Sequence, residues 1–447
     1  MNSGINLRPY QQVLITAFPF ILLMLSQSLN SIIDMFIVGR IGMNAIAAVG
    51  LCGFIFSIMT SCVTGIMISV QTVVAKSIGA GKINQGINAL HSAIFVAIVL
   101  GISIVGLGFF VPKFITLFIH DEVLASNCIT YLQALVLGAP AIGIVRAFRG
   151  YYGGIGENKI SVLIIFSTYF FNFLIGFTLV SLGYGIRGAG LGTCCAFYIG
   201  ACLFCLSGYF IDYKYRFFKV TKIFEQIGVI SKLSFYAGIQ QLFFSAGFAV
   251  MFIIASQMNS PALAVITVLN NLMLLSTTPL IGMGMASAVY VSRSLGENKY
   301  RDAKSWGNIA VKLGFGIFII QLFILINPHY IMGLFIKDNF IVNNYIGLFK
   351  ITVLFVFSEV FAQILKFSMF GAGFNRQLTM ITVPLQWFLF IPLAIYLCLF
   401  KNHGIEILWF SFLVYRLIES IFMLIIWLKE SWVPAKLDNI FPKSANC

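Results

Sequence analysis

The chain of 447 residues is 60% hydrophobic and only 9% charged, and its formal net charge is +14. A soluble domain has about a quarter of its residues charged, so this composition excludes an ordinary water-soluble protein. The positive charge does not indicate nucleic-acid binding, because the basic residues lie in short gaps between apolar runs and form no basic, aromatic-rich polar segment. The composition therefore indicates an integral membrane protein surrounded by lipid.

Apolar runs long enough to cross a bilayer recur along the whole chain. A helix needs about 20 residues to cross the hydrocarbon core, whereas the strands of a barrel would be shorter and alternate in polarity. The fold class expected is all-α and membrane-embedded. Twelve transmembrane helices are predicted, at 13–38, 45–75, 88–112, 124–150, 159–182, 189–211, 229–258, 262–292, 305–327, 343–370, 377–400 and 406–428.

The distribution of basic residues predicts the orientation of these spans. With the N-terminus placed in the cytoplasm, the gaps on that side contain most of the lysines and arginines, and Arg146, Arg149 and Lys366 are counted there. The positive-inside rule then puts both termini in the cytoplasm, in a cell (inner) membrane. The opposite side contains only Arg40, Lys113, Arg187, Lys337 and Lys401.

Internal similarity predicts that the chain consists of two related six-helix lobes. Three pairs of segments share one offset of 217 residues: Ala45–Ala48 with Ala262–Val265, Lys76–Lys82 with Arg293–Lys299, and Gly154–Lys159 with Gly371–Arg376. Because six is an even number of spans, the lobes are parallel repeats around a central cavity, which is a transporter architecture. The expected domains are an N-terminal lobe at 1–211, a cytoplasmic linker at 212–228, a C-terminal lobe at 229–430 and a cytoplasmic tail at 431–447.

The sequence offers no constellation for enzyme chemistry. The Cys202-x-x-Cys205 pair lies within an apolar run and has no second ligand pair, and the four histidines are scattered. The segment Gly79–Lys82 lacks the spacing of a phosphate-binding loop. We therefore expect no catalytic residues, no cofactor and no structural metal.

Acidic residues inside the predicted spans are the strongest candidates for function, since a charge in the bilayer is costly. Asp34 lies in the first span among polar residues, with no basic residue one turn away. Such a carboxylate can exchange a proton or bind Na⁺. Pro19, earlier in the same span, removes a backbone hydrogen bond and predicts a hinge.

The other span acids have basic residues within reach. Glu419 is expected to pair with Arg416, three residues earlier on the same helical face. Glu359, in the tenth span, could pair with Lys366, two turns further on. At the offset of 217, Asp34 corresponds to Met251 and Glu359 to Ile142, so the lobes differ in charge. We expect the first lobe to carry cation coupling and the second to bind substrate, with Glu359 in its cavity.

The motifs and their order resemble those of the multidrug and toxic compound extrusion (MATE) family, from about residue 10 to residue 430. The resemblance is carried by Pro19 with Asp34, by Val38–Gly42, by Gly188–Thr193 and by the glycine-rich segments after spans 2, 4, 8 and 10. It implies a monomeric antiporter that exports cationic, amphipathic organic compounds, such as drugs and toxins, in exchange for H⁺ or Na⁺.

The family pattern also implies a cation-coupling site made of Asp34, Asn172 and Thr193. The acid that members often carry in span 5 is missing, because Gly176 stands at about its place. This departure leaves Asp34 as the main titrating group and favours H⁺ over Na⁺. The expected mechanism is protonation of Asp34 from outside, a bend at Pro19, and closure of the outward cavity with expulsion of the substrate.

Two alternatives remain open from the sequence. A lipid-linked oligosaccharide flippase of the same superfamily would have to bind pyrophosphate, and several arginines or lysines would be expected within its spans. The unpaired charges within the spans are read as mostly acidic, which favours cationic cargo. A membrane-embedded enzyme would need the reactive constellation that the sequence lacks.

Overall fold

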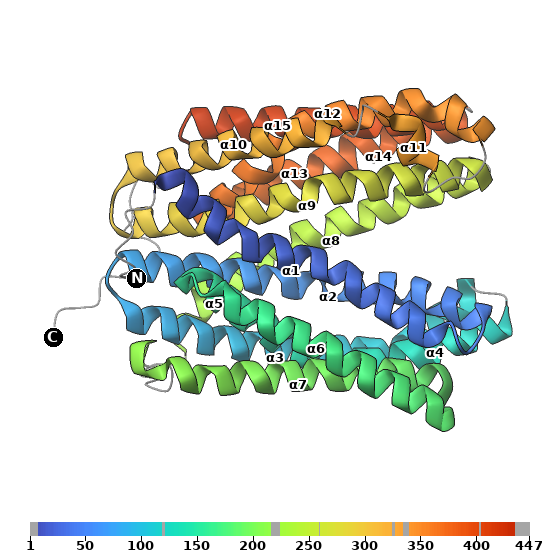
Figure 1. Ribbon diagram of the computed structural model, residues 1–447, viewed down its shortest axis with the longest axis horizontal. Helices are drawn as coiled ribbons and strands as arrows, with labels where there is room; N and C mark the ends of the chain where they lie inside the picture. The colour runs from blue at the N-terminus through green and yellow to red at the C-terminus, as the bar shows by residue number, and fades with distance from the viewer. Residues whose placement is uncertain are drawn as a thin grey trace. The chain divides into compact units, whose positions relative to one another are not determined.

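The computed structural model describes residues 8–118, 121–215, 224–258, 260–323, 327–333, 339–401 and 404–433, and within these ranges it contains helices and no strands (Figure 1). Their bounds are α1 Pro9–Val38, α2 Met43–Gly79, α3 Ile83–Phe118, α4 Glu122–Val136, α5 Ala139–Ile155, α6 Asn158–Leu179, η1 Val180–Tyr184, α7 Gly185–Tyr215, α8 Ile227–Met258, α9 Ser260–Gly296, α10 Tyr300–Leu322, α11 Pro328–Gly333, α12 Asn339–Gly371, α13 Asn375–Pro384, η3 Leu385–Phe390, α14 Ile391–Ile395, η4 Tyr396–Phe400 and α15 Ile405–Leu428.

The helices confirm the predicted all-α membrane fold. Among the described residues, 10 helices are long and apolar enough to cross a membrane, or 11 if the bent pair α4–α5 is one span. In this count, Asn158–Tyr209 is a single candidate span. The chain nevertheless turns back within it, since Gly183 and Gly185 have positive φ and α6 packs alongside α7 (Figure 1). Glycine adopts such angles without strain, so the chain can turn there. The predicted number of twelve spans is not confirmed.

The span predicted at 124–150 is bent. Helices α4 and α5 meet at an angle of 49°, and Pro140 stands in the first turn of α5, where a missing amide hydrogen costs little. Helix α3 lies very close to this bend. A Cβ atom on Gly101 would lie 2.4 Å from the Cα of Pro140, so only glycine fits at that position.

By packing, the chain divides into two compact units. The N-terminal unit is Leu22–Leu242, and the C-terminal unit combines Met1–Ile21 with Phe243–Cys447. The first turns of α1 belong to the C-terminal unit, where the Thr16 hydroxyl and the Tyr290 hydroxyl are hydrogen-bonded at 2.8 Å. The division thus falls inside α1 and α8, whereas the linker was predicted at 212–228. Residues 216–223 of that segment and 434–447 of the predicted tail lie outside the described residues.

Each unit has its own apolar core. In the N-terminal unit the buried ring of Phe148 stacks on Phe204, with centroids 5.6 Å apart. In the C-terminal unit Trp409 and Phe412 of α15 are buried, and Phe390 packs against Phe412 at 5.6 Å. All five tryptophans of the chain belong to the C-terminal unit: Trp306, Trp387, Trp409, Trp427 and Trp432.

Candidate functional site

The side chain of Asp34 in α1 accepts hydrogen bonds from neutral donors on three helices of the N-terminal unit. Asn172 Nδ2 of α6 donates to Asp34 Oδ1 at 2.8 Å, and Thr193 Oγ1 of α7 donates to the same oxygen at 3.3 Å. Asn30 Nδ2, one turn earlier on α1, donates to Asp34 Oδ2 at 3.3 Å. The structure thus brings together the three residues that the family pattern implied, although they are far apart in sequence.

A close contact between α6 and α7 positions Asn172 and Thr193. A Cβ atom on Gly192 would lie 2.4 Å from the Cα of Gly176, so the two backbones touch next to the site. A side chain at Gly176 would also meet Ile37 Cδ1 at 3.0 Å. The position where family members often carry a second acid is therefore occupied by a helix–helix contact in this chain.

One acceptor at this site has no donor. Asn172 Nδ2 donates to Asp34 and to Asn30 Oδ1, the latter at 3.1 Å, while Asn172 Oδ1 is buried without a hydrogen-bond partner. Asp34 itself is half-buried. A carboxylate beside an unsatisfied amide oxygen can hold a proton that the amide accepts, or a small cation such as Na⁺. Within the described ranges, no group of three or more His, Cys, Asp or Glu residues could hold a metal ion.

Pro19 lies inside α1, which runs as one helix from Pro9 to Val38. Its ring removes a backbone hydrogen bond within the helix, which weakens the helix locally. Pro19 belongs to the C-terminal unit and Asp34 to the N-terminal unit, so the helix passes from one unit to the other just after the proline. The hinge stays a prediction.

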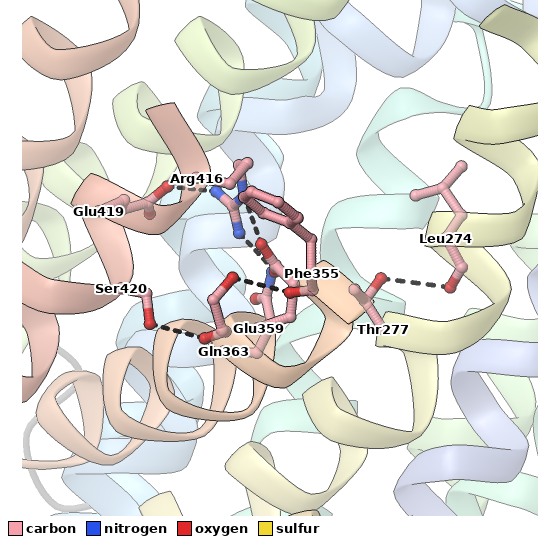
Figure 2. Close-up of polar contacts among 9 residues, drawn as sticks. Leu274, Thr277, Phe355, Glu359, Gln363, Arg416, Glu419 and Ser420 are labelled. Carbon is pink, nitrogen blue, oxygen red and sulfur yellow. Dashed lines mark hydrogen bonds and ion pairs between the residues drawn. The ribbon is translucent and has the colours of Figure 1, made fainter. Parts of the chain in front are cut away.

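The C-terminal unit contains a buried charge cluster formed by Glu359, Arg416 and Glu419 (Figure 2). Arg416 of α15 donates to both oxygens of Glu359 of α12, from Nε at 2.7 Å and from Nη2 at 2.6 Å. Its Nη1 donates to Glu419, which confirms the predicted pair. Gln363 Nε2 also donates to Glu359, at 2.9 Å. The cluster is almost free of solvent, since the exposed fractions of all three charged residues are 2% or less.

The hydrogen-bonded partner of Glu359 is Arg416, whereas the sequence offered Lys366 as a possible partner. The Nζ atom of Lys366 instead lies 5.8 Å from the centroid of the Phe244 ring. Arg416 comes from a helix 57 residues further along the chain, so no local spacing could have indicated it. With its carboxylate enclosed, Glu359 faces no open space, and its role in a substrate cavity stays a prediction.

Arg146 and Arg149 lie within α5 and not in a cytoplasmic gap. Arg146 Nη1 donates to the carbonyl of Thr60 at 2.8 Å and to the hydroxyl of Thr64, both near the middle of α2. Within the described part of the chain, neither arginine forms an ion pair. The premise that unpaired charges within the spans are mostly acidic was therefore wrong. Their position inside the predicted span 124–150 was the signal that could have found them.

The comparisons with known proteins agree with this architecture. The MatE family model matches the chain twice, at residues 19–178 and 237–396, once in each predicted lobe. The chain is 22% identical over 401 residues to the probable multidrug resistance protein NorM of Mannheimia succiniciproducens, which covers 86% of this chain and 85% of the relative.

Two solved structures share the fold. One is an outward-facing multidrug resistance MATE family transporter of the MOP superfamily, with a TM-score of 0.84, 18% identity, and coverage of 94% of this chain and 96% of that chain. The other is a MOP superfamily transporter from Pyrococcus furiosus, for which the reverse polarity of its binding pocket suggests a different function. Its TM-score is 0.82 at 17% identity, with the same coverage of the two chains.

Proposed function

Because the chain belongs to the MatE family, we propose that it is a secondary active antiporter that exports cationic, amphipathic organic compounds in exchange for H⁺, with Na⁺ as the alternative coupling ion. We further propose that it works as a monomer in the cell (inner) membrane, with both termini in the cytoplasm and without a cofactor. The cationic character of the cargo rests on the family resemblance, since Glu359 and Glu419 are both paired with Arg416.

The observation that carries the proposal is a carboxylate surrounded only by neutral donors. Asp34 accepts from Asn172, Thr193 and Asn30 and has no ion pair among the described residues, so its charge can be neutralised by a transported cation. The chain has glycine and not a second acid at position 176, which favours a proton over a Na⁺ ion that needs several oxygen ligands. One charge crossing 100 mV releases about 2.3 kcal/mol, enough for a concentration ratio of roughly fiftyfold.

Protonation would rearrange the hydrogen bonds around Asp34. The protonated oxygen becomes a donor, and the unpartnered Asn172 Oδ1 is an acceptor within the same site. The bonds from Asn172 and Thr193 to the carboxylate then lose their charge assistance, which weakens the attachment of α1 to α6 and α7. In the proposed cycle this release lets α1 bend at Pro19, and the change of access that follows expels the substrate.

Export from energised membrane vesicles tests the proposal. Tetramethylrhodamine methyl ester, a cationic amphipathic dye, is the probe, and Asp34→Asn is expected to reduce its proton-driven transport to the level of vesicles without the protein. Asp302→Asn is the matched control, because Asp302 is an exposed acid in the first turn of α10, and it should transport normally. Undiminished proton-driven transport by Asp34→Asn would refute the mechanism.

Ion replacement separates the remaining alternatives. A protonophore should abolish dye transport, while replacement of Na⁺ by choline should leave it unchanged. The opposite pattern would establish Na⁺ coupling. A lipid-linked oligosaccharide flippase, the second class considered, would transport no dye under either condition, and the same outcome is expected of a membrane-embedded enzyme.

A further inference from the structure

Two arginines lie on one face of α5, in the N-terminal unit. Arg146 and Arg149 are three residues apart, so their Cα atoms are about 4.5 Å apart along the helix axis and their side chains are neighbours. Both residues are half-buried. The mechanism proposed above uses neither of them.

No negative charge in the described part of the N-terminal unit balances this pair. Arg146 donates to neutral oxygens of Thr60 and Thr64, and Arg149 has a buried Nε–H group with no acceptor. Two adjacent cations with an unsatisfied buried donor are costly within a membrane protein, and an anion bound between them would lower this cost.

The equivalent helix of the second repeat, α12, has an acid at the position where α5 has an isoleucine. At the offset of 217 residues, the positions correspond as Ile142 with Glu359, Arg146 with Gln363, and Arg149 with Lys366. In the C-terminal unit the acid at the first of these positions accepts from Gln363 and from Arg416. The N-terminal unit has two arginines at the second and third of these positions but an isoleucine in place of the acid.

We propose that Arg146 and Arg149 bind an acidic group, a carboxylate or a phosphate, on the transported compound. A guanidinium group presents paired N–H donors that match the oxygens of either anion, and Arg146 is already oriented by its bonds to α2. This inference rests on the proposed function and adds to its substrates amphipathic compounds that carry an acidic group beside their cationic centre.

Binding of two matched dyes to the purified full-length protein tests the inference. Tetramethylrhodamine has a free carboxylate, and its methyl ester has the same ring system with the carboxylate masked. Arg149→Gln should weaken binding of the acid by about tenfold, since it removes a charge-assisted contact, and should leave binding of the ester within about twofold. An equal loss for both dyes, or no loss for either, would overturn the inference.

A second variant introduces the acid that the repeat comparison identifies. Ile142→Glu places a carboxylate one turn from Arg146 and two turns from Arg149, and it should compete with the acid dye while the ester still binds. Ile142→Gln has the same size without the charge and is expected to bind both dyes as the parent protein does. Loss of acid-dye binding in Ile142→Gln as well would show that side-chain shape and not charge controls the site, which would contradict the inference.

Two further measurements identify the source of the bound anion and distinguish failure of the anion site from failure of the proposed transport function. Displacement of the acid dye by inorganic phosphate, or by phosphatidylglycerol in mixed micelles, would reassign the site to free phosphate or to a lipid headgroup and overturn the cargo assignment. Since binding is measured without a gradient, failure of proton-driven transport would refute the proposed function alone. Loss of the distinction between the dyes, with transport intact, would refute only the anion site.

Discussion

Replacement of Arg416 by methionine should destabilise the C-terminal unit strongly. The change keeps much of the side-chain volume but removes the cation that two buried acids share, Glu359 and Glu419. Both carboxylates would then remain in a region whose charged side chains are at most 2% exposed. We therefore expect the effect to come from uncompensated charge and not from a cavity.

The expected loss in the free energy of unfolding can be estimated in two ways. Arg416 donates three charged hydrogen bonds, two to Glu359 at 2.7 and 2.6 Å and one to Glu419. At about 1.5 kcal/mol each these amount to roughly 4.5 kcal/mol, and breaking one buried ion pair costs about 3–5 kcal/mol in measured cases. A loss near 4 kcal/mol corresponds to a decrease in Tm of about 10 °C for a unit of this size.

Thermal unfolding in detergent at a fixed scan rate measures this effect. The matched control is Lys304→Met, which removes a similar cation from an exposed pair: Lys304 Nζ lies 2.5 Å from Glu430, and the side chains are 32% and 53% exposed. Solvent-exposed pairs contribute about 1 kcal/mol or less, so the control should lower Tm by no more than about 3 °C. Equal effects of the two variants would refute the reasoning about burial.

A compensating variant tests the same argument in the opposite direction. Adding Glu359→Gln and Glu419→Gln to Arg416→Met removes the two buried carboxylates that have lost their cation. The Tm of the triple variant should therefore return most of the way to that of the parent protein. If it is as unstable as the single variant, the loss comes from packing around Arg416, and the electrostatic account is wrong.

Two further predictions concern helix contacts. Gly192→Ala should lower Tm and dye transport together, because the added methyl would lie 2.4 Å from the Cα of Gly176, and overpacking costs about 1–3 kcal/mol. Gly106→Ala, where no atom lies within 4 Å, is its control, and equal Tm values for the two would contradict the contact. Tyr290→Phe removes the hydroxyl bonded to Thr16 at 2.8 Å, so amide hydrogen exchange in the first turns of α1 should accelerate about fivefold. Unchanged exchange there would show that this bond does not anchor the helix.

Much of the fold could be predicted because each membrane span is a long continuous run of apolar residues. Apolar length is set by bilayer thickness, so the helices appear near their predicted positions. The bend between α4 and α5 was missed, although Pro140 marks the first turn of α5. The break at Gly183–Gly185 falls close to the predicted gap after residue 182, where glycine permits positive φ.

The site was predictable only where a family pattern supplied long-range information. Asp34, Asn172 and Thr193 were placed together by resemblance, and the structure confirms that they touch. The bond from Arg416 to Glu359 joins helices 57 residues apart, which neither periodicity nor spacing can reveal. Arg146 was misplaced because basic residues near a span end were assigned to water, whereas this one bonds to the middle of α2.

The confinement of all five tryptophans to the C-terminal unit has a practical consequence for spectroscopy. Intrinsic tryptophan fluorescence will follow events in that unit, including the stacked pair Trp427 and Trp432, whose centroids are 4.4 Å apart. The N-terminal unit, which contains Asp34 and the arginine pair, has no tryptophan and gives no tryptophan fluorescence. An indole introduced there, for example by Phe197→Trp in a background without the native tryptophans, would give each half its own optical signal.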